Sequence, residues 1–158
     1  MRLWHKALIP VLPDKQLLGQ WRECCAIASN IANKGTPNHV LVNKIMKYNI
    51  DHFWSYGKYI AEEMERRSFK VDFEKFNQWF PFGGYECISI DKLFYLWHSD
   101  RYLTQCFCNL QEKYDCGAID WYDYEPIYCM YKRATEKKLA AAFNGFAAEL
   151  VKKCDLPL

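Results

Sequence analysis

The sequence lacks any hydrophobic stretch long enough to cross a membrane. Its 158 residues contain no apolar run that approaches the roughly 18 residues required by a membrane-spanning helix. The first residues are basic, but Pro10 and Pro13 interrupt them and leave no core for a signal peptide. We therefore expect a cytoplasmic protein that makes no contact with a membrane.

Internal repeats, low-complexity segments and glycine- or serine-rich linkers are also missing. Hydrophobic residues make up 51% of the chain and aromatic residues 17%, against 25% charged residues, which excludes a disordered protein. A chain of this length can bury a core of its own without disulfides or metals. One domain covering residues 1–158 is the expected organisation.

The usual signatures of metal and nucleophile sites are absent from the sequence. The 8 cysteines include Cys106, Cys108 and Cys116, but their spacing does not give the paired C-x₂-C motifs of zinc sites. The sequence has no H-E-x-x-H motif, no phosphate-binding loop and no serine or cysteine nucleophile motif. We expect cysteines that act as small buried hydrophobic residues, no metal and no cofactor.

Helical periodicity dominates the chain, and no segment alternates as a strand would, so the predicted fold class is all-α. The first helix is expected to begin at Asp14, as its N-cap, and to end before Gly35. Breaks are expected at Pro81 and at Gly83–Gly84, and an aromatic loop over 115–133. The further predicted helices cover 36–48, 51–67, 89–98, 100–114 and 134–153.

Charge is unevenly distributed along the chain, although the net charge is only +2. Residues 1–50 carry seven basic and two acidic side chains, whereas residues 72–125 carry four basic and ten acidic ones. A basic N-terminal third fits contacts to phosphate groups, provided that the basic residues share one face.

The predicted first helix has two unlike faces. Leucines, cysteines and Trp21 fall on one side at helical spacing, whereas Gly19, Arg22, Glu23 and Ala26 fall on the other. Small residues beside a carboxylate leave room for a bulky substrate. From the residues alone, this second face is either a solvated surface or the floor of an active site.

The same stretch carries a resemblance to a known family. The sequence "LPDKQLLGQWREC" resembles the first helix of phage endonuclease V, a pyrimidine dimer DNA glycosylase and lyase, and the start "MRL" is similar to its processed N-terminus. The segment "HFWSYGKYIAEEMERRSFKV" is similar to a later helix of that family. The resemblance covers about residues 1–71 and is closest to a bacterial branch.

The resemblance implies a compact helical domain, monomeric and without a cofactor, that excises a damaged base from double-stranded DNA and then cleaves the strand as an AP lyase. The N-terminal amine would form the imine, and a carboxylate would assist proton removal. Because Arg2 is bulky, we expect the initiator methionine to be retained, so that Met1 supplies the amine. An α-amino group is suited to this task because its ordinary pKa, about 7.7–8.0, lies far below that of lysine.

The other site residues follow from the same resemblance. Glu23 would transfer the proton, and Arg2 and Arg22 would contact phosphates or the opened base stack around a flipped nucleotide. Further contacts to DNA are expected from Lys6, Lys15, His39, Lys44 and Lys47.

Two other functions stay open on the sequence alone: a non-catalytic nucleic-acid-binding module on the same fold, and a helical interaction protein. The aromatic residues of 121–131 fit either stacking on bases or packing in the core.

Overall fold

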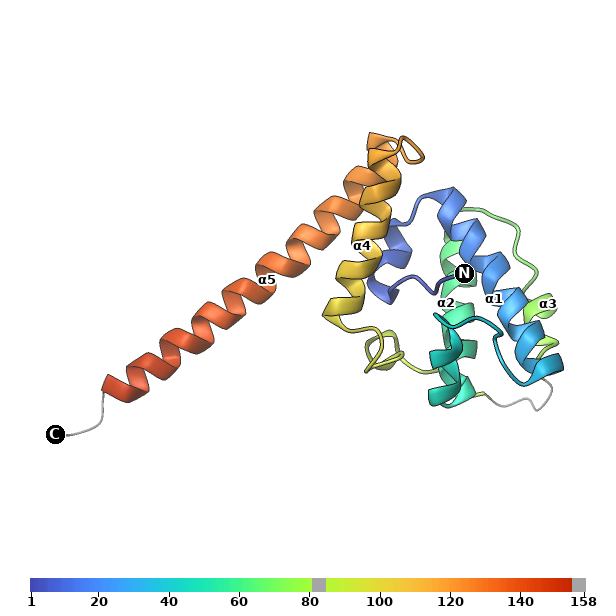
Figure 1. The fold of residues 1–158 in the computed structure, drawn as a ribbon, viewed down its shortest axis with the longest axis horizontal. Coiled ribbons are helices and arrows are strands. Elements are labelled where there is room, and N and C mark those ends of the chain that lie inside the picture. The colour runs from blue at the N-terminus through green and yellow to red at the C-terminus, as the bar shows by residue number, and fades with distance from the viewer. Residues whose placement is uncertain (81–84, 155–158) are drawn as a thin grey trace.

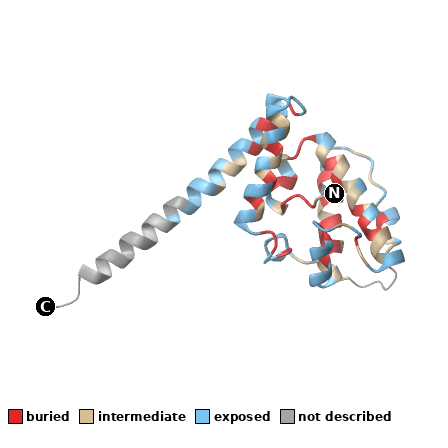
Figure 2. Cartoon of the chain, viewed as in Figure 1, coloured by how far each residue is buried: buried red, intermediate tan, exposed pale blue. Residues whose placement is uncertain are grey.

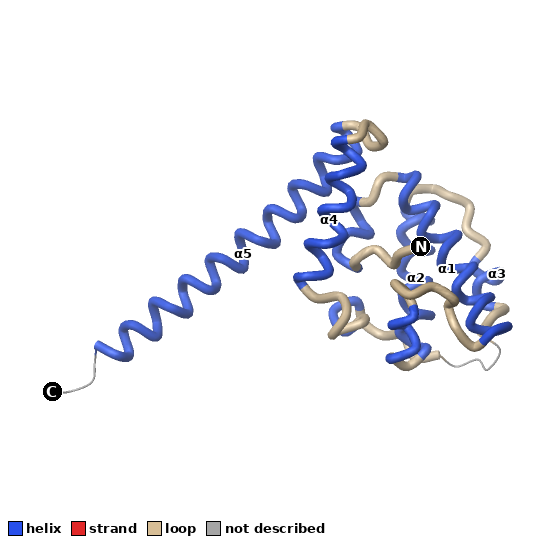
Figure 3. Tube along the Cα trace, in the orientation of Figure 1, coloured by secondary structure: helices blue, strands red, loops and turns tan. Residues whose placement is uncertain are grey.

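The computed structural model describes residues 1–80 and 85–154, and the side chains through residue 138 together with that of residue 141. Within these ranges every regular element is a helix, so the all-α prediction is confirmed (Figure 3). None of the described helices combines the length and the apolar character needed to cross a membrane. In chain order the α-helices are α1 (Asp14–Lys34), α2 (Ile50–Arg66), α3 (Phe73–Asn77), α4 (Asp100–Asp115) and α5 (Trp121–Cys154), and the 3-10 helices are η1 (Lys6–Val11), η2 (Asn43–Lys47) and η3 (Ile90–Lys92).

Helices α1 and α2 pack against each other, and the short helix α3 contacts both. The close approach of α2 and α3 depends on Gly57 of α2, because a Cβ atom there would lie 2.3 Å from the ring of Phe76 in α3. One hydrophobic cluster contains buried residues from Leu3 to Ile127 and so joins the N-terminal segment to the start of α5. Figure 2 shows these buried positions on the facing sides of the helices.

The limits of α1 match the prediction except at its first residue. The helix ends before Gly35, whose φ of 67° is the left-handed conformation that glycine favours. The predicted N-cap role of Asp14 is wrong, because Pro13 occupies the capping position and Asp14 is the first helical residue. The Asp14 carboxylate instead pairs with Arg67 at 3.0 Å.

The aromatic loop predicted over 115–133 is also wrong, because α5 begins at Trp121. Asp120 precedes the helix and accepts a hydrogen bond from the Asp123 N–H at 2.9 Å. Tyr124, Ile127 and Tyr131 recur at helical spacing on the side that faces α4. Tyr131 stacks on Phe107 with ring centres 3.9 Å apart, so these aromatic side chains pack α5 onto α4. Lys138 of α5 also pairs with Asp100 of α4, and beyond this contact α5 continues away from the other helices (Figure 1).

Two further predicted helices are mostly turns. Within the predicted helix 36–48 only η2 forms, because Asn38 has a φ of 59° and the side chain of Asn43 accepts the His39 N–H. Within 89–98 only η3 forms, because Phe94 has a φ of 48° and is fully buried. The predicted breaks at Pro81 and Gly83–Gly84 lie outside the described residues, as do the side chains of most of the predicted helix 134–153.

Candidate active site

Residues 1–5 form an extended N-terminal segment that runs between α1 and α4 and brings the first residue to the middle of the helical body (Figure 1). Helix α1 holds one side of this segment. The backbone N–H of Arg2 donates to Oε2 of Glu23 at 2.9 Å, and the N–H of Trp4 donates to Oε1 of Gln20 at 2.8 Å. Because Gln20 is buried, this second bond lies in the core.

Side chains from α2 and from the region of α4 hold the other side. The hydroxyl of Tyr56 donates to the carbonyl of Trp4 at 2.8 Å, and the hydroxyl of Tyr102 donates to the carbonyl of Leu3 at 2.5 Å. The N–H of Lys6 donates to Nδ1 of His98 at 3.1 Å. The N-terminal segment is therefore fixed by elements that are far apart in the sequence.

These contacts place the amine of Met1 next to the carboxylate of Glu23. The amine nitrogen lies 3.7 Å from Oε1 of Glu23, and the two side chains are 22% and 35% exposed. Two of the site residues expected from the sequence therefore meet in space.

The amine and the carboxylate open into a cavity of about 410 Å³, which we call the Glu23 cavity. Gly19 lies on its wall, and a Cβ atom there would meet no heavy atom within 4 Å, as expected for a residue that leaves free space beside the carboxylate. The cavity is lined by Met1, Arg2, Trp4, Lys15, Gln16, Gly19, Gln20, Glu23, Leu41, Asn109 and Lys113. Three basic side chains and the amine thus surround one carboxylate.

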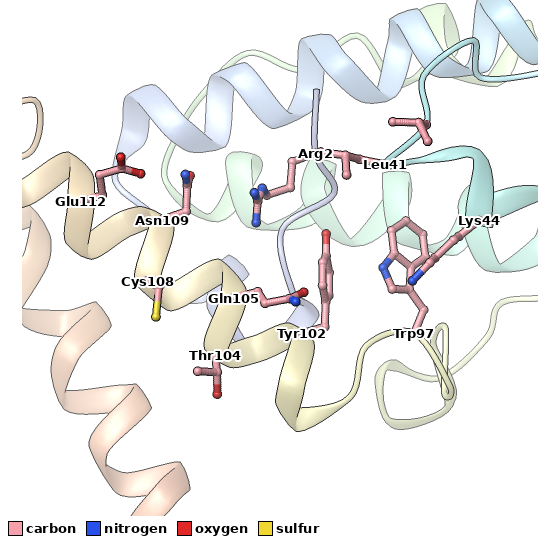
Figure 4. A pocket seen from close by; sticks show the side chains of 11 residues that line it. Arg2, Leu41, Lys44, Trp97, Tyr102, Thr104, Gln105, Cys108, Asn109 and Glu112 are labelled. Atoms are coloured by element: carbon pink, nitrogen blue, oxygen red, sulfur yellow. The ribbon is translucent and has the colours of Figure 1, made fainter.

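A second cavity of about 710 Å³ shares Arg2, Leu41 and Asn109 with the first, and we call it the Trp97 cavity. Figure 4 shows that its walls come from the N-terminal segment, from α4 and from the loop between α1 and α2. Aromatic rings and amide side chains line it together. The lining consists of Arg2, Val40, Leu41, Lys44, Trp97, Tyr102, Thr104, Gln105, Cys108, Asn109 and Glu112.

Two buried histidines, one from the end of the N-terminal segment and one from the residues before α4, pack against each other. His5 Nδ1 accepts from the N–H of Ala7, so its Nε2–H donates to the carbonyl of His98 at 3.0 Å. Burial lowers the pKa of His5 to about 4. Burial and the nearby His5 lower the pKa of His98 to about 2. Both rings are therefore neutral and can accept the backbone N–H groups that face them.

The remaining expected site residues are spread around these cavities. Lys15 lines the Glu23 cavity and Lys44 the Trp97 cavity, whereas Lys47 and Lys44 line a neighbouring hollow. His39 belongs to the turn before η2, where its Nδ1 accepts the N–H of Leu41. Arg22 is exposed on α1 and is not among the residues that line the two cavities.

Lys6 lies apart from the other basic residues of the expected set. Its ammonium donates to the carbonyls of Asp91 and Leu93 at 2.6 and 3.0 Å. Partial burial lowers the pKa of this side chain, against the attraction of Asp91, which raises it. These bonds tie η1 to the segment around η3.

Sequence reasoning missed six residues that line the Glu23 cavity: Trp4, Gln16, Gln20, Leu41, Asn109 and Lys113. Gln20 was detectable, because it is a polar residue among the core positions of α1 between Leu17 and Cys24. Asn109 and Lys113 belong to α4, for which the sequence offered no pattern beyond helical spacing. Among the described residues, no group of three or more histidine, cysteine or acidic side chains is arranged to hold a metal ion.

Comparison with known proteins gives one match. Residues 1–77 match the family model described as pyrimidine dimer DNA glycosylase, which confirms over this range the resemblance noted in the sequence. No curated protein and no solved structure matches the chain.

Proposed function

Starting from the pyrimidine dimer DNA glycosylase match of residues 1–77, we propose that this protein excises a damaged base from double-stranded DNA and then cleaves the strand as an AP lyase. The observation that carries the proposal is the 3.7 Å distance between the Met1 amine and the Glu23 carboxylate at an open cavity. A nucleophile next to a proton-transfer group is the arrangement that covalent excision of a base requires.

The first step uses the amine as nucleophile. The lone pair of the neutral Met1 nitrogen attacks C1′ of the damaged nucleotide, and the bond from C1′ to the base breaks. The electron pair of that bond leaves with the base, which takes up a proton. The nitrogen then loses one proton, and its lone pair forms the C=N bond as the bond from C1′ to the ring oxygen O4′ breaks. O4′ takes up a proton, which leaves an iminium between the N-terminus and C1′.

The second step uses the carboxylate. Glu23 removes a proton from C2′, the electron pair forms a C1′–C2′ enamine, and elimination breaks the bond from C3′ to the 3′ phosphate oxygen. Water then hydrolyses the imine and returns the free amine. Glu23 also accepts the N–H of Arg2. This bond keeps the carboxylate next to the N-terminus, and therefore close to the C2′ proton of the sugar that is bound to the Met1 nitrogen.

The basic residues around the cavities bind the phosphate backbone in this proposal. Arg2 lines both cavities, and its guanidinium lies 5.8 Å above the ring of Trp4. Lys15 lines the Glu23 cavity, Lys44 lines the Trp97 cavity, and Lys47 lines the neighbouring hollow with Lys44. Arg22 is exposed on α1, and His39 lies in the turn before η2. We assign Lys6 to holding η1 in place, since its ammonium already donates to two carbonyls.

A sugar inside a stacked duplex cannot reach the amine unless the nucleotide leaves the helix. We therefore include nucleotide flipping in the proposed mechanism. The lesion itself is proposed to be a pyrimidine dimer or a related damaged pyrimidine, by analogy with the family description.

Borohydride trapping on DNA that contains one abasic site tests the proposal. Reduction of the imine should give a covalent adduct that maps to the N-terminal peptide, and intact mass should show Met1 at its end. Acetylation of the α-amine should abolish the adduct. An adduct that persists after acetylation would move the role to a lysine, for which Lys15 and Lys113 line the same cavity. Binding without any adduct would identify a non-catalytic DNA-binding module.

A further inference from the structure

The turn between α1 and η2 exposes two adjacent apolar side chains. Val40 is 80% exposed and Leu41 is 53% exposed. Single exposed apolar residues are common on protein surfaces, but this pair lies at the rim of the proposed active site. Leu41 lines both the Glu23 cavity and the Trp97 cavity, and Val40 lines the latter.

The backbone of this turn is held by bonds on both sides of the pair. The N–H of Leu41 donates to Nδ1 of His39 at 3.3 Å, and the N–H of Val42 donates to the carbonyl of His39 at 3.0 Å. Val42 is fully buried in the core and anchors the turn. The two exposed side chains therefore project from a fixed support, and in Figure 4 Leu41 lies beside Arg2.

Cations flank the pair on several sides. Arg2 and Lys44 line the Trp97 cavity together with Val40 and Leu41. Lys47 follows one turn later, and it lines the neighbouring hollow with Lys44. An apolar tip between positive charges fits a DNA duplex, in which phosphates surround a base stack that an apolar side chain can enter.

We propose that Val40 and Leu41 form a wedge that enters the base stack of duplex DNA and occupies the gap left when a nucleotide is flipped toward the Met1 amine. This proposal rests on the proposed function, because it assigns the wedge to the same substrate. The wedge separates adjacent bases, whereas Arg2 and Lys44 bind the phosphates on either side. A single-stranded substrate has no stack to open and does not need the wedge.

The test uses the double variant Val40→Ser, Leu41→Ser, with Met46→Ser as a matched control. Met46 is 50% exposed near the same turn and is not among the residues that line the two cavities. Imine trapping is measured on an abasic site in a duplex and on the same strand without its complement. The duplex carries 2-aminopurine opposite the abasic site, whose fluorescence rises when its stacking is lost.

We expect the double variant to trap the duplex at least about tenfold more slowly than the parent protein, because without the wedge the separated bases stack again and the flipped nucleotide returns to the duplex. Trapping of the single strand should be unchanged, and the fluorescence rise on duplex binding should be lost. Met46→Ser should behave as the parent protein in all three measurements. Unchanged single-strand trapping also shows that the double variant is folded.

An equal loss of trapping rate on the duplex and on the single strand would overturn the wedge, because the two residues would then contribute to binding of any DNA. An unchanged fluorescence rise in the double variant would overturn it too, as would a change in oligomeric state that accounts for the lost activity. If the parent protein traps neither substrate but opens the duplex, and the double variant does not, the proposed function fails and the wedge stands.

Discussion

The carboxylate of Glu23 contacts two successive nitrogens at the start of the chain: Oε1 lies 3.7 Å from the amine of Met1, and Oε2 accepts the backbone N–H of Arg2 at 2.9 Å. One side chain therefore positions the amine and lies where it can receive a proton. These two roles can be separated by a substitution that keeps the shape of the side chain and removes its charge.

Glu23→Gln should reduce strand cleavage by about 10²–10⁴-fold, because the amide can still accept the Arg2 N–H but cannot act as a base. Binding to abasic DNA should stay nearly the same. Cleavage on gels and binding by anisotropy measure the two effects. Glu62→Gln is the control, since Glu62 lies exposed on α2 and pairs with Lys58 at 3.8 Å. A loss of binding as large as the loss of cleavage would indicate a purely structural carboxylate.

Gln20→Leu should lower the free energy of unfolding by about 1–3 kcal/mol, because it leaves the buried N–H of Trp4 without its acceptor. It should also slow imine formation, because the hydrogen bond from Trp4 to Gln20 helps to hold the N-terminal segment that carries the Met1 amine. Thermal unfolding and the rate of trapping measure these effects. Gln16→Leu, at a half-buried position on the same cavity, should leave the stability close to that of the parent protein. Equal stability of the two variants would contradict the anchoring role of Gln20.

The histidine pair predicts a loss of stability in mild acid. The pKa of His5 is lowered to about 4 and that of His98 to about 2, both from an ordinary value of 6.5. Below pH 6.5 these two histidines bind protons in the unfolded chain but not in the folded chain. The free energy of unfolding therefore falls as the pH falls from 6.5 toward 4. The expected size is about 3 kcal/mol for His5 alone.

Denaturant unfolding between pH 4.5 and 7 measures this slope. His98→Asn should reduce the slope to the part that His5 contributes, because the amide oxygen can replace Nδ1 as acceptor for the Lys6 N–H without binding a proton. A pH-independent stability over this range in the parent protein would refute the prediction.

Two lysines of the basic N-terminal third should respond differently to removal. Lys44→Ala should weaken binding to all DNA sequences alike and reduce the slope of log affinity against log salt by about 1. Lys6→Ala should instead lower stability and leave that slope unchanged, because its ammonium is bound to the carbonyls of Asp91 and Leu93. Salt titrations and melting curves compare the two variants. Matching salt slopes for both variants would refute the separate roles.

The parts of the fold that amphipathic spacing describes were predictable. Helices α1, α2 and α4 form close to their expected limits because each has a clear apolar face. The turns around Asn38 and Phe94 were not, because side-chain hydrogen bonds and tertiary burial there oppose local helix propensity. The start of α5 was not predictable, because Pro126 lies inside it and the stacking of its aromatic side chains on α4 is a tertiary contact.

The pairing of Met1 with Glu23 was predictable only through the family resemblance, since 21 residues separate Arg2 from Glu23 and nothing in the spacing brings them together. The bonds from Tyr102 and His98 to the N-terminal segment were beyond sequence reasoning. They link positions more than 90 residues apart, and their donors and acceptors are partly backbone groups, which leave no mark on the sequence.

The family match ends at residue 77, but the physical site does not. Tyr102 holds Leu3, His98 holds Lys6, and Asn109 and Lys113 complete the wall opposite Glu23. The stretch that matches the family model therefore supplies only one side of these contacts, and residues beyond 77 supply the other side. A fragment that ends at residue 77 would keep the Met1 amine and the Glu23 carboxylate but lose the hydrogen bonds from Tyr102 and His98 that fix the N-terminal residues.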